Sequence, residues 1–310
     1  MNLRKSLSAL APADFVTISF FLFLTALNIA FHARVNEWLL LVVVNLIVVG
    51  AIVWLANAAE RKQTRLLIGL HRWYLYVAVL SVFKELYLMV HPIHPIDYDE
   101  LFIAIDRWMF GVDPTVWMSQ FINPILTELL QLAYFAYYII FIILGVELYR
   151  HYPIQTFDHA AFMIVYGFYL SYVGYFMLPA VGPRFTLHDF AMMDAELPGM
   201  FIAEYLRAFI NWAESIPRNV PNPADYVQRD VFPSGHTQLA LVVTWLAFIH
   251  RTKKRWIIAV ITALMIIGTV YLRYHYVIDL VGGVIFFLVT IWTGSRLESW
   301  WDRARKQLPA

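Results

Sequence analysis

The sequence predicts an all-α, polytopic membrane protein, and two observations support this prediction. Hydrophobic residues make up 61% of the 310 positions and charged residues 15%, whereas about a quarter of the residues in a soluble domain are charged. The apolar residues also form eight runs, each near the roughly 20 residues that a helix needs to cross a bilayer. These runs are 15–31, 37–57, 67–90, 124–149, 157–179, 235–250, 256–273 and 276–294.

We expect the eight helices to form one domain, residues 1–310. Residues 1–66 supply two appended helices, and about residues 67–295 supply a six-helix core. Basic residues precede the first run and no good small-residue cleavage site follows it, so we interpret this run as an uncleaved anchor. The long segments 91–123 and 180–232 each contain an amphipathic pattern, which predicts helices lying at the membrane interface.

The charges of the connecting segments predict the orientation. Fourteen Lys and Arg residues fall on the side of the bundle that holds both termini, against seven on the other side. By the positive-inside rule both termini are cytoplasmic, and an even number of spans agrees with this. We therefore expect an integral protein of a bacterial inner membrane, with Arg184, His236 and His275 on its extracytoplasmic face. The net charge of +1 gives no reason to expect nucleic acid as a partner, and the lack of Cys excludes disulfides and thiol catalysis.

Residues 232–236, Phe-Pro-Ser-Gly-His, lie where an outer loop turns into the sixth predicted helix. Backbone N–H groups at a helix start are unpaired and carry the positive end of the helix dipole, which favours an anion such as phosphate. Gly235 permits close backbone approach, and the Ser234 hydroxyl adds a donor. His236 lies beside that anion and titrates near neutral pH, which suits proton transfer.

His275 and Asp279 are four residues apart, so they share one face of a helix. We expect Asp279 to accept the N–H of one imidazole nitrogen in a hydrogen bond, which leaves the other nitrogen free as a nucleophile. Arg184, in the Leu-Pro-Ala-Val-Gly-Pro-Arg segment, supplies a guanidinium that matches phosphate, and Arg273 offers a second positive charge. A cation, N–H donors, a nucleophile and an acid suffice for phosphoryl transfer, so we expect no metal and no cofactor.

These segments resemble the type 2 phosphatidic acid phosphatases (the PAP2 superfamily), which are related to vanadium haloperoxidases and bacterial acid phosphatases. Residues 233–236 match the middle motif of that family, and its last motif ends in a His and an Asp spaced as His275 and Asp279 are. The resemblance covers about residues 120–295. It implies that His275 forms a phosphohistidine, that Asp279 orients it and that His236 protonates the leaving group. Arg184 would be the arginine of the first motif, and the substrate a lipid phosphate with water or an alcohol as acceptor.

Three positions depart from the family pattern. Met177 stands where the first motif usually has Lys, Phe185 where a Pro follows its Arg, and Thr269 where the last motif usually has Arg. A last motif without that Arg resembles the inositol phosphorylceramide synthase and sphingomyelin synthase branch, which transfers a phosphoryl headgroup to an alcohol. The Phe-Pro-Ser-Gly-His segment instead resembles the hydrolase branch, so the acceptor stays open. A lipid transporter or scramblase and a catalytically inactive homologue are two alternatives on the same fold.

Overall fold

The computed structural model describes residues 7–217 and 220–307, and in these residues the chain is helical with no β-strand. The eight main helices run close to the predicted spans. They are α2 (Pro12–Ala30), α3 (Trp38–Lys62), α4 (Arg65–Ile93), α7 (Pro124–His151), α8 (Ile154–Met177), α12 (Gly235–Ile249), α13 (Arg255–Tyr271) and α14 (Val277–Lys306).

The two long connections contain the short helices that the amphipathic patterns predict. The first connection holds α5 (Asp99–Phe110), α6 (Pro114–Met118) and the 3₁₀ turn η1 (Ser119–Phe121). The second holds α9 (Pro183–Thr186), η2 (Phe190–Met192), α10 (Met193–Glu196), α11 (Ala203–Ala213) and η3 (Pro223–Asp225).

The prediction of a polytopic helical membrane protein is confirmed. Among the described helices, α2, α3, α4, α7, α8 and α14 are long and apolar enough to cross a membrane. Helices α12 and α13 are apolar but shorter, with 15 and 17 residues. The division into residues 1–66 and 67–295 stays a prediction. Arg4, Lys5 and Arg218, which contribute to the charge count, lie outside the described residues.

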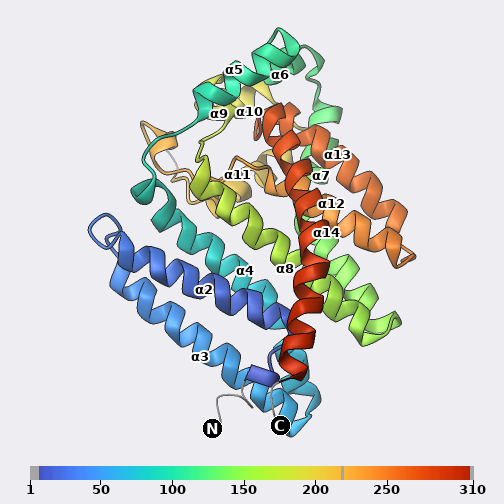
Figure 1. Ribbon diagram of the computed structural model, residues 1–310. Helices are drawn as coiled ribbons and strands as arrows, with labels where there is room; N and C mark the ends of the chain where they lie inside the picture. The colour runs from blue at the N-terminus through green and yellow to red at the C-terminus, as the bar shows by residue number, and fades with distance from the viewer. Residues whose placement is uncertain (1–6, 218–219, 308–310) are drawn as a thin grey trace.

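The helices cross the bundle alternately, so the connections gather at its two ends. Figure 1 shows both ends of the chain at one end of the bundle, while α5, α6, α9 and α10 cap the opposite end. Helix α14 runs from that cap to the end where the termini lie. The segments that carry Arg184, His236 and His275 all connect helices at the capped end, so the fold brings the three predicted motifs to one region.

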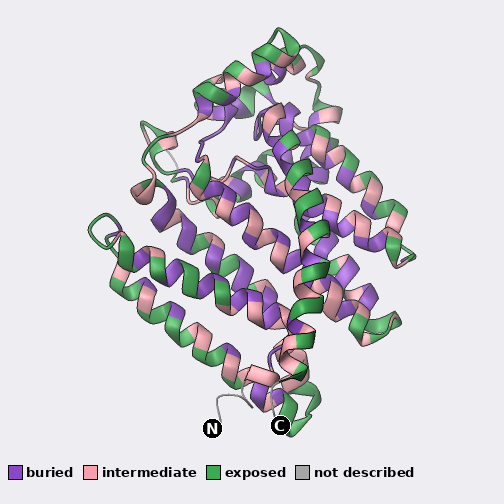
Figure 2. Cartoon of the chain, in the orientation of Figure 1, coloured by how far each residue is buried: buried purple, intermediate pink, exposed green. Residues whose placement is uncertain are grey.

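The outer helices turn apolar side chains away from the protein. Helix α3 exposes Leu39, Leu40, Ile47 and Trp54, each more than half accessible, and Figure 2 shows exposed positions recurring along its length. A helix that is apolar on its exposed face as well as its buried one is typical of a membrane span. The bilayer is therefore the solvent for this surface.

The two appended helices join the rest of the bundle through a buried polar contact. The Glu85 carboxylate of α4 accepts hydrogen bonds from the Asn28 side chain of α2 at 3.0 Å and from the Asn45 side chain of α3 at 2.8 Å. All three residues are buried. Interhelical hydrogen bonds of this kind are a main source of specificity between helices in a bilayer, where apolar surfaces have no preferred partner.

Candidate active site

The two predicted catalytic histidines lie side by side at the capped end of the bundle. Nδ1 of His236 and Nε2 of His275 are 3.4 Å apart, and the two rings meet nearly edge to face, with centroids 5.6 Å apart. Tyr134 and Tyr137 of α7 cover the His236 ring from one side, with ring centroids within 4.6 Å of it. Residues 39 positions apart in the sequence therefore form one imidazole pair, in which His275 is buried and His236 is partly buried.

The turn that carries His236 is built as a helix cap. The Ser234 hydroxyl accepts a hydrogen bond from the Thr237 amide at 3.2 Å, which is the usual role of Ser at an N-cap. The Ser234 amide donates to the Asp279 carbonyl at 3.0 Å, so the start of α12 is bonded directly to the first turn of α14. Both Ser234 and Gly235 are fully buried.

Gly235 makes room for a tyrosine. A Cβ atom at this position would lie 2.5 Å from the Tyr175 hydroxyl oxygen, a contact that no real side chain makes. Sequence reasoning assigned this glycine to close approach of an anion. The structure gives it a packing role against α8, and its backbone amide still belongs to the first turn of α12.

The pairing of His275 with Asp279 follows the predicted spacing. Nδ1 of His275 lies 3.4 Å from Oδ2 of Asp279, somewhat beyond the usual hydrogen-bond range, and the same oxygen accepts the Tyr276 amide at 2.8 Å. Burial lowers the pKa of His275 well below its usual value, and the neighbouring His236 and Arg184 lower it further. The imidazole is thus neutral at pH 7, which is the form that a nucleophile requires.

Arg184 lies in the same buried region. Its guanidinium donates to the Glu214 carboxylate and, at 3.3 Å, to the Asn211 side chain, and it packs 4.9 Å from the ring centroids of Tyr274 and Phe185. In this structure one nitrogen of the Arg184 guanidinium therefore binds a carboxylate oxygen and another binds an amide oxygen, and a phosphate could take the place of these acceptors.

A second acid lies close to Arg184. Burial, followed by the charge of Glu214, raises the pKa of Asp230 to about 8, while Arg184 and Lys84 act in the opposite direction. Lys84 donates hydrogen bonds to the Ala213 carbonyl and to the Ser215 hydroxyl, the latter at 3.0 Å. Glu214, Asp230 and Lys84 were not among the residues that sequence reasoning assigned to the site. No motif marks them, because they come from different segments.

Arg273 is directed elsewhere. Its backbone is left-handed, with φ of 68°, and its guanidinium binds the Glu196 carboxylate and, at 3.4 Å, the Ser119 hydroxyl. Its role as a phosphate ligand stays a prediction. Thr269 donates its hydroxyl to the carbonyl of Ile266 within its own helix, and Met177 is exposed, so neither position supplies the charge found in the family motifs.

Helix α5 positions two of the three motifs through Asp99. The Asp99 carboxylate accepts the backbone amides of Val181 at 3.0 Å and Gly182 at 2.8 Å, just before Arg184. It also accepts the Tyr276 hydroxyl at 2.8 Å, next to His275. Asp99 is 5% exposed on a helix whose outer face is open, so its carboxylate joins the first and last motifs in the interior.

Asp106 extends this arrangement to the start of α14. Its two carboxylate oxygens accept the backbone amides of Val277 at 2.8 Å and Ile278 at 2.9 Å, which are the first two amides of the helix and lack partners within it. Asp99 and Asp106 are seven residues apart and so share one face of α5. This seven-residue spacing is the sequence signal that could have indicated their role, whereas the segment 91–123 was expected only to form a helix at the membrane interface.

Two adjacent glycines of α14 pack closely against the turn at residues 232–236. A Cβ on Gly282 would lie 2.6 Å from the Phe232 ring, and a Cβ on Gly283 would lie 2.8 Å from the Ser234 carbonyl oxygen. Helix α14 therefore approaches α12 more closely than any side chain larger than hydrogen allows. This close packing sets the distance between the two histidines.

Several buried polar atoms at this site have no hydrogen-bond partner among the described residues: Arg184 Nε, His236 Nε2, Thr237 Oγ1 and Asp279 Oδ1. Buried polar groups are normally satisfied, so a cluster of exceptions indicates a site that binds a polar ligand. The arrangement offers a buried cation, helix-start amides, a neutral imidazole and a second imidazole. This set suits a tetrahedral oxyanion.

Comparison with known families supports the same conclusion. The sequence model of the PAP2 superfamily matches residues 100–293. This range is more than half of the chain and includes every motif described above. The chain belongs to the PAP2 superfamily. Searches of curated proteins and of solved structures found no significant match. Membership, together with the apolar helices, supports a lipid phosphatase-type function in an integral membrane protein.

Proposed function

We propose that the protein cleaves a lipid phosphate ester, or transfers its phosphoryl group, through a covalent intermediate on His275. The observation that carries the proposal is the 3.4 Å approach of Nε2 of His275 to Nδ1 of His236, with Asp279 behind the first ring. Nε2 of His275 attacks phosphorus, and the bond between phosphorus and the leaving oxygen breaks. His236 enters this step as the imidazolium, donates a proton to that oxygen as it departs and is left neutral.

The second half of the reaction reverses these roles. His236 takes a proton from water or from an alcohol, the resulting oxygen attacks phosphorus, and the bond to His275 breaks with return of its electron pair to Nε2. In-line displacement places the entering and leaving groups on opposite sides of phosphorus. Phosphorus must therefore enter between the two rings, and the His236 ring moves away from His275 when the substrate binds.

The surrounding groups offset the charge that develops on the phosphoryl oxygens. Buried Arg184 exchanges the Glu214 carboxylate for the substrate phosphate, and the amides of Gly235 and His236 are the first of α12. Fixed donors in a site shielded from water supply much of the stabilisation in phosphoryl transfer. The Asp279 carboxylate stabilises the positive charge that develops on the His275 ring as the intermediate forms.

We place the site on the extracytoplasmic side of a bacterial inner membrane, with both termini in the cytoplasm, because the Lys and Arg residues concentrate at the opposite end. This chain has Thr269 where the last family motif usually has Arg, as in the sphingolipid phosphotransferases that it resembles. This resemblance favours an alcohol as acceptor. The Phe-Pro-Ser-Gly-His turn favours water.

The test is turnover by the purified protein with phosphatidic acid, with a prenyl diphosphate and with a phospholipid plus an alcohol. Quenching turnover with an alkaline denaturant, in which phosphohistidine is stable, should trap a phosphorylated protein labelled at His275, and His275→Ala should abolish both the label and turnover. His91→Ala, which removes an exposed histidine at the same end of the bundle, serves as the matched control. Normal turnover by His275→Ala would end the assignment of the nucleophile.

The transporter and scramblase alternative finds little support in the polar residues of the bundle. Glu85 is bonded to Asn28 and Asn45, and Glu147 accepts the Lys253 amide at 2.5 Å. These carboxylates are engaged with local partners in separate parts of the bundle. An inactive homologue would lack the phosphorylated intermediate, so the trapping experiment also tests that alternative.

A further inference from the structure

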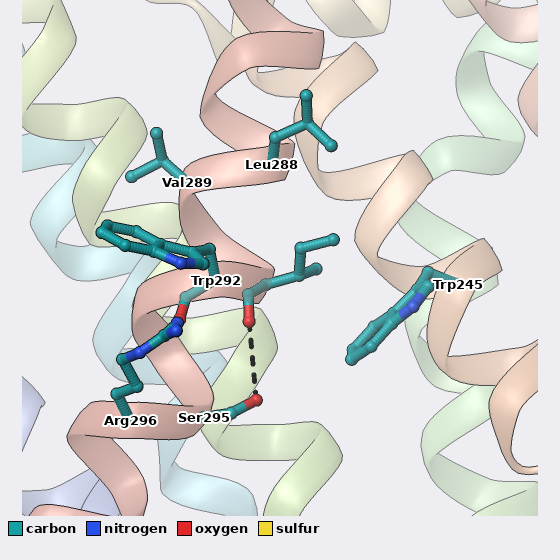
Figure 3. Close-up of a pocket in the computed structure, with 7 residues that line it drawn as sticks. Trp245, Leu288, Val289, Trp292, Ser295 and Arg296 are labelled. Atoms are coloured by element: carbon teal, nitrogen blue, oxygen red, sulfur yellow. Dashed lines mark hydrogen bonds between the residues drawn. The ribbon is translucent and has the colours of Figure 1, made fainter.

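A groove opens on the membrane-facing side of the bundle, between α12 and α14. It has a volume of about 640 Å³ and is lined by Trp245 of α12 and by Leu288, Val289, Ile291, Trp292, Ser295 and Arg296 of α14. Figure 3 shows Trp245 on one wall, facing Leu288 and Ser295 across the gap, with Arg296 at one end of the lining. The lining is almost entirely apolar, so its occupant in a bilayer is a hydrocarbon chain.

The groove results from the unequal lengths of the two helices. Helix α12 has 15 residues and α14 has 30, so they extend about 22 Å and about 45 Å at 1.5 Å per residue. Arg296 is the twentieth residue of α14 and lies about 28 Å from its start. It therefore lies beyond the end of α12, near the opposite boundary of a hydrocarbon layer about 30 Å thick.

Arg296 is the one charged residue among those that line the groove. Its guanidinium packs 4.6 Å from the Trp292 ring centroid and donates one N–H group to the Trp292 carbonyl. The carboxylates that follow it on α14 have partners elsewhere. Glu298 binds His159 at 2.6 Å and Asp302 binds Arg305 at 2.7 Å. The groove thus ends in a positive charge with no lining carboxylate to neutralise it.

The connection after α12 adds positive charge at the same end of the bundle. Residues 251–255 contain four Lys and Arg residues: Arg251, Lys253, Lys254 and Arg255. Basic residues beside a membrane attract anionic lipid, and each contributes about 1 kcal/mol near a negatively charged surface. An apolar groove that ends at an arginine beside a basic loop is complementary to an acyl chain attached to a phosphate.

We propose that the groove between α12 and α14 binds an anionic phospholipid at the membrane surface opposite the histidine pair. One acyl chain lies against Trp245 and Leu288, and the phosphate binds the free N–H groups of Arg296. This site lies at the far end of the bundle from His275, and the proposal does not depend on the reaction there.

The experiment is native mass spectrometry of the purified protein after addition of equal amounts of dioleoyl phosphatidylglycerol and dioleoyl phosphatidylcholine. The expected result is preferential retention of one phosphatidylglycerol. Arg296→Gln should reduce that preference about tenfold, the effect of losing one charged hydrogen bond. Arg150→Gln removes an exposed charge on the same membrane side, away from the groove, and should leave the preference unchanged.

A second variant tests the groove separately from its charge. Leu288→Trp fills the gap opposite Trp245 and should reduce retention of both lipids at that site, while gel filtration and circular dichroism show an intact fold. Inorganic phosphate, added alone, should not bind measurably, because the groove and not the phosphate supplies most of the contact. Equal retention of the two lipids by the wild type, or equal losses in Arg296→Gln and Arg150→Gln, would overturn the proposal. Unchanged retention in Leu288→Trp would overturn it as well.

Discussion

Replacing Asp106 by Asn tests whether α5 positions the catalytic segment. The substitution keeps the size of the side chain and one oxygen acceptor, but it replaces the other oxygen by an NH₂ group. Asp106 accepts the Val277 and Ile278 amides at 2.8 and 2.9 Å, so one buried N–H group of α14 loses its partner and faces another donor.

The magnitude follows from these two contacts. An unsatisfied buried donor costs about 1–3 kcal/mol, and loss of a negative charge at a helix N-terminus costs about 0.3–1 kcal/mol more. The two costs together are about 2 kcal/mol. We expect the first turn of α14, which begins two residues after His275 and carries Asp279, to shift in response. Since each ~1.4 kcal/mol corresponds to a factor of ten in rate, we expect kcat to fall roughly 10- to 100-fold.

The assay is steady-state turnover with the best lipid phosphate substrate, together with the amount of trapped phosphorylated protein. A positioning role lowers kcat and the rate of phosphorylation and leaves KM within about twofold of the wild type. The matched control is Asp113→Asn in the same connection, which breaks only a pair with the exposed Arg107 and should leave turnover unchanged. If Asp106→Asn turns over within twofold of the wild type, α5 does not position the site.

Three further predictions concern packing and pH. Gly283→Ala should lower turnover at least tenfold, because the new Cβ would lie 2.8 Å from the Ser234 carbonyl oxygen. Gly50→Ala, in open space on α3, should have no effect on turnover. Equal activity of the two variants would contradict this prediction. The raised pKa of Asp230, about 8, keeps the folded state protonated where the unfolded state is ionised, so stability falls as pH rises from about 4 to 8. Asp230→Asn should therefore flatten the fall in Tm between pH 6.5 and 8.5, and an unchanged slope would refute the argument. The lowered pKa of His275 acts in the opposite direction. The unfolded chain takes up that proton first below about pH 6.5, so Tm should fall between pH 6.5 and 5 more steeply in the wild type than in His275→Asn, and parallel curves would count against it.

Helix length and hydropathy determined the main helices from the sequence alone. An apolar run of membrane length has one stable form in lipid, because every backbone N–H and C=O group must be bonded within the segment. For that reason the predicted spans agree with the helices to within a few residues at most ends. The largest difference is α14, which continues to Lys306, because its last turns are polar and leave the hydrocarbon layer.

The site was determined in part by local spacing. The pairing of His275 with Asp279 comes from their nearness in the sequence, although His275 lies in the turn before α14 and not, as the spacing predicted, on one helix face with Asp279; the cap at Ser234 comes from its place before an apolar run. Both are short-range properties, so the sequence determined them. The direction of Arg273 is not short-range, because it depends on a left-handed residue and on Glu196, 77 positions earlier in the chain.

Only the tertiary structure decided which distant groups complete the site. Asp99 and Asp106 lie on α5, Glu214 follows α11 and Asp230 lies in the loop before α12, and no motif marked any of them. The carboxylates of Asp99 and Asp106 accept buried backbone amides, and that of Glu214 accepts a hydrogen bond from Arg184. Hydropathy and helical periodicity specify which face of a helix is buried, but the partner of a buried charge depends on contacts across the whole chain.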